Sequence, residues 1–446
     1  MNARPGSGHG LTPPHEPRAR SGAARQRVVI VGGGIAGVSL AWLLDGVHDV
    51  TLLESDAELG GHARSIDVTL PGGRRVVVDA GAQYFGPKSH PTYWRLVRSV
   101  LGVPTVAAPM NLTVSAYQTQ AALLVSPDVR RTAPLLRPRF WPALASLAAF
   151  TAGGKALERD GDWSLTAEEF VGRLPIPRSV RDGVLFPLCG AMFGFSVPQV
   201  KQMSARSVVA FVIRGLGDGL LAPYDYHNAT NGLRAVVEAL SAGLTTVTSH
   251  VGAGATGLRR SGGVYRVTDA RGRVHEADHV VLAAPPYAAG PLAGQLAGAG
   301  VAAQACARFP YLPARLAVHH DPAYMPARRR AWSGFNVLTD GDFCEPSMWY
   351  GGFRDFGIFK SWISHRREPP RDTVATFDYR HAHETPEYHR AQTALAGVQG
   401  TGNLWFAGSH LTDVCSQESA LLSAVRVAER LAPDAEHLRR LSPPVA

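Results

Sequence analysis

Three glycines, Gly32, Gly34 and Gly37, stand at the spacing G-x-G-x-x-G directly after the apolar run RVVIV. In such a loop the first glycine permits a tight turn, the second lets backbone N–H groups approach phosphates, and the third lets a helix pack closely on the strand. The next strand-like run, DVTLLE, ends in Glu54, whose carboxylate can accept hydrogen bonds from ribose hydroxyls. This order predicts a dinucleotide-binding βαβ unit with a diphosphate at the helix N-terminus.

A second glycine pair follows in ELGGHARS, residues 58 to 65. An NAD-binding unit has no need of it, because the acid that ends the second strand already makes the ribose contact. The pair therefore indicates a larger ligand. The residues that we expect around the nucleotide are Gly32, Gly34, Ile35, Ala36, Gly37, Glu54, Ser55, Gly60, Gly61, His62, Ala63 and Arg64.

The stretch from VVIVGGGIAG to ESDAELGGHARS resembles the flavoprotein superfamily of amine oxidases, protoporphyrinogen oxidase and phytoene-type desaturases. The resemblance implies FAD as the cofactor. In that family a G-G-R-x-x-S/T element passes under the FAD diphosphate; here His62 stands at the arginine and Arg64 follows, so we expect Arg64 to supply the charge. The later part of the chain is most similar to a poorly characterised bacterial branch, linked in part to fatty-acid modification.

Three further blocks carry the same resemblance. VVVDAGAQYFGP, residues 76 to 87, resembles the strand and turn that reach the flavin ring, which implies contacts from Gly81 and Ala82 and catalytic roles for Gln83 and Tyr84. The block after residue 245 implies that the Val251 backbone meets the adenine, with Val247 as the alternative. NLWFAGSHLTDVCSQESALLSA resembles the helix that starts at the flavin pyrimidine. The residues that this last block implies at the cofactor are Gly408, Ser409, Glu418 and Ser419.

Two departures from the family bear on the reaction. Ser416 falls at a tyrosine of the aromatic cage of monoamine oxidases, and Arg315 falls at the lysine that holds a water near flavin N5. An arginine stays protonated, so Arg315 can orient a group but cannot act as a base. We therefore expect hydride abstraction from an apolar, lipid-like or secondary-metabolite substrate by a dehydrogenase, desaturase or oxidase. Amine or amide oxidation to an imine is the alternative, and a non-redox isomerase or cyclase that retains FAD is a further one.

The resemblance also implies an α/β and α+β fold with two parts. A Rossmann-type FAD-binding domain is assembled from the discontinuous segments 27–100, 231–300 and 396–435. A mixed sheet-plus-helix substrate domain takes 101–230 and 301–395, where aromatic runs such as CGAMFGFSVPQV and SMWYGGFRDFGIFKSW predict an apolar pocket. Residues 1–26, rich in Pro, Gly, Ser and Arg, are expected to be a disordered leader, and 436–446 a tail.

Composition narrows the partners. The 446 residues are 45% hydrophobic and 18% charged, which is typical of a globular protein, and the formal charge of +9 comes without a nucleic-acid-binding motif. We expect a small apolar or carrier-bound substrate, O2 or another electron acceptor, no nucleic acid, and at most a shallow membrane contact through residues 135 to 150. The four cysteines are widely spaced, so neither disulfides nor zinc is indicated and a cytoplasmic location is expected. No histidine spacing predicts a metal site, and FAD is expected to be non-covalent although Cys415 lies near the flavin.

Overall fold

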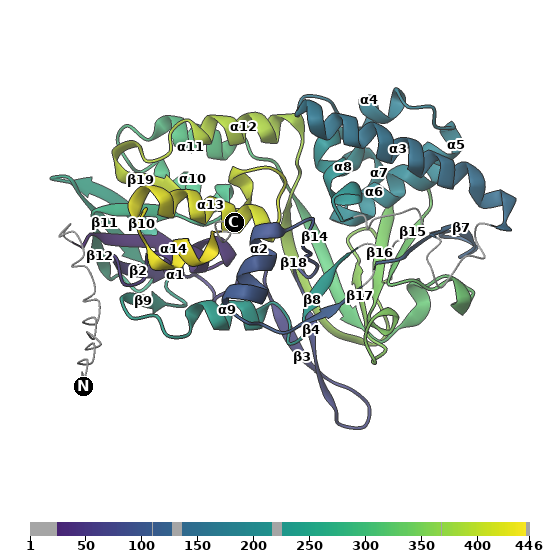
Figure 1. Cartoon of the computed structure of the whole chain (residues 1–446), viewed down its shortest axis with the longest axis horizontal. Helices are drawn as coiled ribbons and strands as arrows, with labels where there is room; N and C mark the ends of the chain where they lie inside the picture. The colour runs from purple at the N-terminus through teal and green to yellow at the C-terminus, as the bar shows by residue number, and fades with distance from the viewer. Residues whose placement is uncertain (1–24, 109, 127–135, 216–224, 367, 443–446) are drawn as a thin grey trace, which may run out of the picture.

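The computed structural model describes residues 25–108, 110–126, 136–215, 225–366 and 368–442. Its first layer is a parallel sheet of five strands in the order β19-β13-β1-β2-β9 (Figure 1). The strands are β1 (Arg27–Val31), β2 (Asp49–Leu53), β9 (Val247–His250), β13 (His279–Leu282) and β19 (Leu404–Phe406). The central runs are apolar and β-branched because both faces of the sheet are covered by helices.

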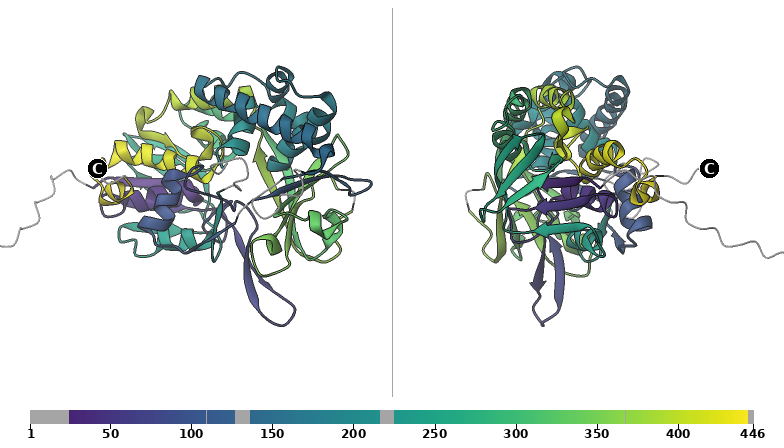
Figure 2. Two further views of the ribbon diagram at one scale, coloured as in Figure 1. Left: turned by 45° about the vertical axis from the view of Figure 1, so that its right-hand side comes forward. Right: turned by 90° about the vertical axis from the view of Figure 1, so that its left-hand side faces the viewer.

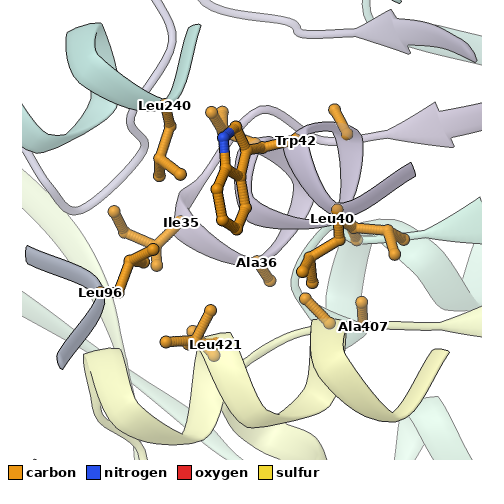
Figure 3. Packing of buried hydrophobic residues seen from close by; sticks show 14 of the residues in the cluster. Ile35, Ala36, Leu40, Trp42, Leu96, Leu240, Ala407 and Leu421 are labelled. Carbon is orange, nitrogen blue, oxygen red and sulfur yellow. The ribbon is translucent and has the colours of Figure 1, made fainter. Parts of the chain in front are cut away.

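Side chains alternate between the two faces of this sheet. Val28 and Ile30 pack with α1 (Ile35–Leu44), α9 (Arg234–Ser241) and α13 (Gln417–Leu431). Val29 and Val31 pack with α10 (Pro286–Ala293), α11 (Gly300–Ala307) and α12 (Pro386–Ala396). All ten residues of α1 are buried, and Figure 3 shows its residue Ile35 among Leu96, Leu240 and Leu421. An antiparallel sheet of β10 (Ala255–Ser261), β11 (Val264–Asp269) and β12 (Val274–Ala277) adjoins this core.

The second part of the molecule is a seven-stranded sheet with helices on one face (Figures 1 and 2). Its order is β18-β14-β17-β16-β15-β6-β7, and it is antiparallel except between β15 and β6. The strands are β6 (Leu112–Ala116), β7 (Ala122–Val125), β14 (Tyr311–His319), β15 (Phe335–Thr339), β16 (Cys344–Trp349), β17 (Phe359–Trp362) and β18 (Thr373–Ala382). The covering helices are α3 (Trp141–Asp160), α4 (Ala167–Gly172), α5 (Arg178–Val180), α6 (Phe186–Phe193), α7 (Val197–Gln202) and α8 (Ala205–Ile213).

A hairpin connects the two parts. Strands β3 (Ser65–Thr69) and β4 (Arg75–Asp79) project from the molecule in Figure 1, and their residues Val68 and Val78 pack against Leu316 and Val318 of the seven-stranded sheet. Four short elements lie between the two parts along the chain. They are the helix α2 (Pro91–Arg95), the π-helical turn Leu96–Val100, and a ribbon of β5 (Thr105–Ala107) and β8 (His227–Ala229).

The expected mixed α/β architecture is confirmed, with two differences in detail. Helices α11 and α12 lie in segments expected to belong to the substrate domain, yet both pack on the nucleotide-binding sheet. The expected tail contains α14 (Glu436–Leu441), which packs on α1 through Trp42 and His437, whose ring centroids are 4.1 Å apart. The expected leader lies outside the described residues up to position 24. Within the described chain no helix is long and apolar enough to cross a membrane.

Candidate cofactor and active site

The carboxyl ends of the five parallel strands meet at one edge, which is where open α/β sheets bind ligands. Gly32 follows β1, Glu54 follows β2, Val251 follows β9 and Ala283 follows β13, while Gly408 lies just after β19. Segments that are far apart in the sequence therefore supply one site.

The glycine loop has the geometry that its spacing predicts. Gly32 has a φ of +109° and a Cβ there would lie 2.8 Å from the Ala283 backbone, while a Cβ at Gly37 would overlap the Gly32 carbonyl oxygen. At Gly34, by contrast, a Cβ would meet no protein atom within 4 Å. Gly34 is also the N-cap of α1, and no side chain caps this buried helix. A buried, uncapped helix N-terminus requires an outside acceptor, and a diphosphate fits it.

Glu54 is fixed by the backbone and side chain around it. One carboxylate oxygen, Oε2, accepts from the Gly33 N–H at 2.6 Å, and Oε1 accepts from Ser55 Oγ at 2.9 Å and from the Asp56 N–H at 2.8 Å. The residue is only 7% exposed. Its carboxylate is thus held at the end of β2 beside the glycine loop, where a ribose is expected.

The second glycine pair lies directly against the glycine loop. The Gly60 N–H donates to the Gly33 carbonyl oxygen at 2.8 Å, and a Cβ at Gly61 would lie 3.3 Å from Gly34 Cα. Gly60 and Gly61 both have positive φ, +127° and +54°, which glycine adopts without strain. The pair therefore borders the space beside Gly34 that a diphosphate would occupy.

Arg64 has an aromatic neighbour on the seven-stranded sheet. Its guanidinium lies 5.5 Å from the ring centroid of Phe377, a residue of β18 in the seven-stranded sheet. A contact between Arg64 and the phosphates stays a prediction. His62 has solvent-accessible surface although burial lowers the pKa of its ring, and it packs against Tyr379 with ring centroids 5.2 Å apart.

The turn after β4 continues the site from His62. The Ala82 N–H donates to the His62 carbonyl oxygen at 2.8 Å, and a Cβ at Gly81 would overlap that same oxygen. Gln83 is 3% exposed, and neither its amide nitrogen nor its amide oxygen has a hydrogen-bond partner within the described chain. An unpaired buried amide is costly, so this turn is suited to a ligand with polar groups on its edge.

Three side chains from outside the nucleotide-binding sheet hold this turn. Tyr350 Oη accepts from the Asp79 N–H at 3.2 Å, and the Tyr379 hydroxyl donates to the Ala80 carbonyl oxygen at 3.1 Å. Lys360 Nζ, from β17, donates to the Gly81 carbonyl oxygen at 3.2 Å. Our sequence reasoning missed Lys360, although it is the one charged residue in the strand-like run FGIFKSWI.

Lys360 is buried to 2% exposure, and desolvation lowers its pKa to about 8 although Asp79 opposes the shift. Burial also raises the pKa of Asp79. The Asp79 carboxylate is engaged elsewhere, since its Oδ1 accepts from Ser65 Oγ at 2.6 Å and from the Leu233 N–H at 2.8 Å. Within the described residues, Lys360 has no carboxylate within 4.0 Å.

The start of α13 differs from expectation at Glu418. Its carboxylate accepts from the N–H groups of Thr92, at 3.0 Å, and Tyr93, at 2.7 Å, so both of its oxygens cap α2. Ser416 accepts from the Ser419 N–H and caps α13, while Ser419 Oγ donates to the Val414 carbonyl oxygen at 2.5 Å. The cage tyrosine is thus replaced by a helix cap.

Three more of the expected cofactor residues follow strands of the parallel sheet at its carboxyl edge. The Gly408 N–H donates to Ser423 Oγ at 2.8 Å, and Ser409 hydrogen-bonds the Cys415 thiol. Val251 lies beyond the end of β9, with its carbonyl oxygen accepting from Arg271 at 2.7 Å. Val247 pairs with Val50 at the opposite end of β9 and packs on the core, and a contact between the Val251 backbone and the adenine stays a prediction.

Arg315 does not reach the flavin-facing turn. Its neighbour Ala314 pairs with Tyr379, whose hydroxyl contacts Ala80, whereas Arg315 pairs with Asp378. Because side chains alternate along a strand, Arg315 and Asp378 point to the opposite face of the sheet. There the Arg315 side chain is 58% exposed and forms an ion pair with Asp378. The expected catalytic placement of Arg315 is therefore corrected.

The face of the sheet that carries Tyr379 is aromatic. His381 stacks on Trp362 with centroids 5.7 Å apart and lies near Phe193 and Phe195 of the helical layer. Desolvation lowers the pKa of His381 to about 4, so the ring is neutral. His381 and Tyr84 are both half-buried side chains.

A buried polar network lies behind Cys415. Glu384 accepts from Ser207 Oγ at 2.9 Å and from the Cys415 N–H at 3.2 Å, and Ser207 Oγ also contacts His389 Nε2 at 2.8 Å. Desolvation raises the pKa of Glu384 to about 7. The Cys415 thiol lies 2.7 Å from the Tyr388 hydroxyl, and burial raises its pKa.

Comparison with known proteins identifies the family. Residues 35–314 match the family model described as flavin containing amine oxidoreductase. The chain belongs to this family. Flavin-containing amine oxidoreductases bind FAD, and the chain is accordingly an FAD-dependent oxidoreductase. No curated protein sequence matches the chain.

Solved structures show the same fold at low sequence identity. Cyclohexylamine oxidase from Brevibacterium oxydans IH-35A has a TM-score of 0.66 at 16% identity, over 92% of this chain and 100% of that one. A fatty acid isomerase from P. acnes, described as producing CLA, has a TM-score of 0.65 at 14% identity, over 91% and 99%. A putative protoporphyrinogen oxidase from Exiguobacterium sp. 255-15 has a TM-score of 0.60 at 14% identity, over 92% and 99%.

The residues of this flavin-containing amine oxidoreductase fit FAD. The uncapped start of α1 and the glycine pair Gly60 and Gly61 suit the diphosphate, and Glu54 suits the ribose. Gln83, on the turn Gly81–Tyr84, offers an amide group without a hydrogen-bond partner in the described chain to a polar edge of the cofactor. The described residues hold no group of three or more His, Cys, Asp or Glu side chains that could bind a metal ion.

Proposed function

We propose that this flavoprotein takes a hydride from an apolar, lipid-like substrate and so forms a double bond in it. The observation that carries this proposal is the neutral aromatic face of the seven-stranded sheet, where His381 stacks on Trp362 and the Tyr379 hydroxyl donates to the Ala80 carbonyl oxygen beside the Gly81–Tyr84 turn. Desolvation keeps His381 uncharged and none of these rings carries a negative charge, so the surface gives an ammonium group no counter-charge and suits a hydrocarbon. Gln83, Tyr84 and the cofactor residues named above, Ser55, Ala63 and Ala82 among them, form the proposed site.

The family supplies the redox chemistry. When bound, FAD accepts a hydride from a substrate carbon, and O2 or another acceptor then removes the electrons. The chain's own contribution is to orient the substrate: the aromatic rings bury its chain, exclude water, and hold one C–H bond toward the turn. The neighbouring carbon loses a proton to solvent, and the electron pair of that C–H bond completes the double bond.

Two other functions have support in the solved structures. Amine oxidation is favoured by the likeness to cyclohexylamine oxidase and to putrescine oxidase, the latter with a TM-score of 0.65 at 15% identity. Isomerisation of a fatty acid without net oxidation is favoured by the likeness to the fatty acid isomerase. The replacement of the cage tyrosine by the helix cap Ser416 argues against the first of these.

One experiment separates the three. The purified holoprotein is titrated anaerobically with unsaturated fatty acids, branched acyl compounds and primary amines, while the flavin absorbance is followed and products are analysed by mass spectrometry. A dehydrogenase bleaches the flavin and yields an acyl product lighter by two hydrogens. An isomerase changes the double-bond position at unchanged mass with no lasting bleaching. Bleaching by amines alone would overturn the proposal in favour of an amine oxidase.

A further inference from the structure

The segment Asp79–Gly81 is anchored at three successive residues by side chains from the seven-stranded sheet and the turn after β16. Tyr350 and Tyr379 are neutral, whereas Lys360 brings an ammonium group to the Gly81 carbonyl. We infer that Lys360 is a positioning residue: it fixes the Gly81 carbonyl, and with it the turn Gly81–Tyr84, and it places a buried positive charge behind that turn. This inference rests on the proposed site, in which the flavin ring lies on this turn.

A purely structural role explains the lysine poorly. Lys360 is paired across the sheet with Val318 and Met348, so its methylene chain lies beside apolar side chains. For packing alone, methionine or leucine would serve at this position without burying a charge. Burying an ammonium group is costly unless several partners compensate it. Here the one hydrogen-bond partner found for Nζ within the described chain is the Gly81 carbonyl oxygen.

The surrounding charges compensate the ammonium group only in part. The acid that acts on Lys360 is Asp79 of β4, whose carboxylate is bound to Ser65 and Leu233. Arg354, from the loop after β16, acts on Asp79 with the same sign of charge as Lys360, and Tyr84 and Tyr350 are neutral. The charge of Lys360 is therefore directed at the backbone of the turn and at whatever ligand lies on its other side.

A positive charge in that place has a redox consequence. Reduction places negative charge on a flavin ring, and a fixed cation nearby stabilises the reduced form because the charge is already in position. Because the pKa of Lys360 is lowered to about 8, its charge is present at pH 7 and mostly lost at pH 9. The stabilisation of the reduced form is therefore expected to decline over this range.

The test is the two-electron midpoint potential of the FAD in the full-length holoprotein. It is measured at pH 7 and pH 9 by enzymatic reduction with xanthine and xanthine oxidase against a reference dye. It needs no substrate of this protein. The variants are Lys360→Met, which removes the charge and the donor, Lys360→Gln, which keeps a neutral donor, and Lys360→Arg, which stays charged. Arg315→Met removes an exposed cation from the opposite face of the same sheet and is the matched control.

At pH 7, Lys360→Met and Lys360→Gln are expected to lower the potential by about 30 mV, which is a tenfold change in the two-electron equilibrium constant. The difference from the unmodified protein should shrink at pH 9. Lys360→Arg should have a potential near that of the unmodified protein at pH 7. At pH 9 its potential should be the higher of the two, because arginine keeps its charge. The potential of the control Arg315→Met should equal that of the unmodified protein at both pH values.

Equal potentials in Lys360→Gln and Lys360→Arg, each with FAD bound, would overturn the inference, and this comparison holds even if Lys360→Met fails to fold. A change in thermal stability without a change in potential would also overturn it, since that is what a structural role gives. Because no substrate is used, failure of the lipid-substrate proposal leaves this result standing, whereas a protein that binds no FAD would contradict both.

Discussion

The Gly60 N–H donates a hydrogen bond to the carbonyl oxygen of Gly33 at 2.8 Å. This bond joins two glycine segments that follow different strands and leaves Gly34 between them with open space where a Cβ would stand. The protein alone does not require glycine at position 34, since its φ of −69° is accessible to any residue. A ligand that approaches the backbone there does require it.

Gly34→Ala is therefore expected to separate folding from cofactor binding. The free energy of unfolding of the apoprotein should differ from that of the unmodified apoprotein by no more than about 1 kcal/mol, because alanine is a weaker N-cap than glycine. FAD affinity should fall at least about tenfold, because the methyl group occupies space beside the uncapped helix. Fluorescence titration of the apoprotein with FAD and thermal unfolding measure the two effects. Gly300→Ala, which also adds a methyl group in open space, is the control, and equal FAD affinity in both variants would contradict the proposed diphosphate site.

Glu384 is expected to make stability decrease as pH rises. Its folded pKa of about 7 lies above its ordinary value of 4.5, so the folded protein binds more protons than the unfolded chain between these values. The contribution is complete below pH 4.5 and is lost as pH rises through 7.

Glu384→Gln imitates the protonated acid. Relative to the unmodified protein it should be more stable at pH 8 than at pH 5, by on the order of 3 kcal/mol, since one pKa unit is about 1.4 kcal/mol. Denaturant unfolding at the two pH values measures this difference. A difference that does not change with pH would show that the raised pKa is wrong.

The FAD is expected to be released when the protein is denatured. Cys415 is held against Tyr388 and Ser409, and burial raises the pKa of its thiol, so little reactive thiolate is present. Acid precipitation should leave the flavin in solution, and the denatured chain should have its unmodified mass of 47.6 kDa. A mass increase equal to FAD, lost in Cys415→Ser, would instead show a thioether link.

Arg315→Met is expected to leave the rate of flavin reduction within about twofold of the unmodified protein. The ion pair with Asp378 is exposed and contributes little to stability, and its loss does not disturb the other face of the sheet. Stopped-flow reduction by whichever compound bleaches the flavin in the anaerobic titration measures the rate. A tenfold loss at unchanged stability would restore Arg315 to the active site.

The nucleotide-binding fold could be predicted because its signal is local: loop, helix, strand and terminal acid follow one another within a short stretch of chain. The orientation of Arg315 could not, because a shift of one residue in a strand moves a side chain to the other face. Alignment finds the strand but does not fix which residue faces the cofactor. Lys360 was missed for a related reason, since only the topology of the seven-stranded sheet brings it to Gly81.

Short elements were also beyond sequence reasoning. Helix α14 spans six residues, too few to be stable alone, and it depends on the stacking of His437 on Trp42 of α1.

Glu418 was expected at the cofactor because of its place at the start of α13. Its true partners, the N–H groups of Thr92 and Tyr93, lie in a helix from the first quarter of the chain.

The three anchors on Asp79, Ala80 and Gly81 mean that the two parts of this protein are not interchangeable modules. A chimaera that joined this nucleotide-binding part to the sheet of another flavoprotein would lose Tyr350, Lys360 and Tyr379 together, and with them the support of the turn. Transplanting the substrate specificity of a relative would therefore succeed only if these three side chains were carried across with it.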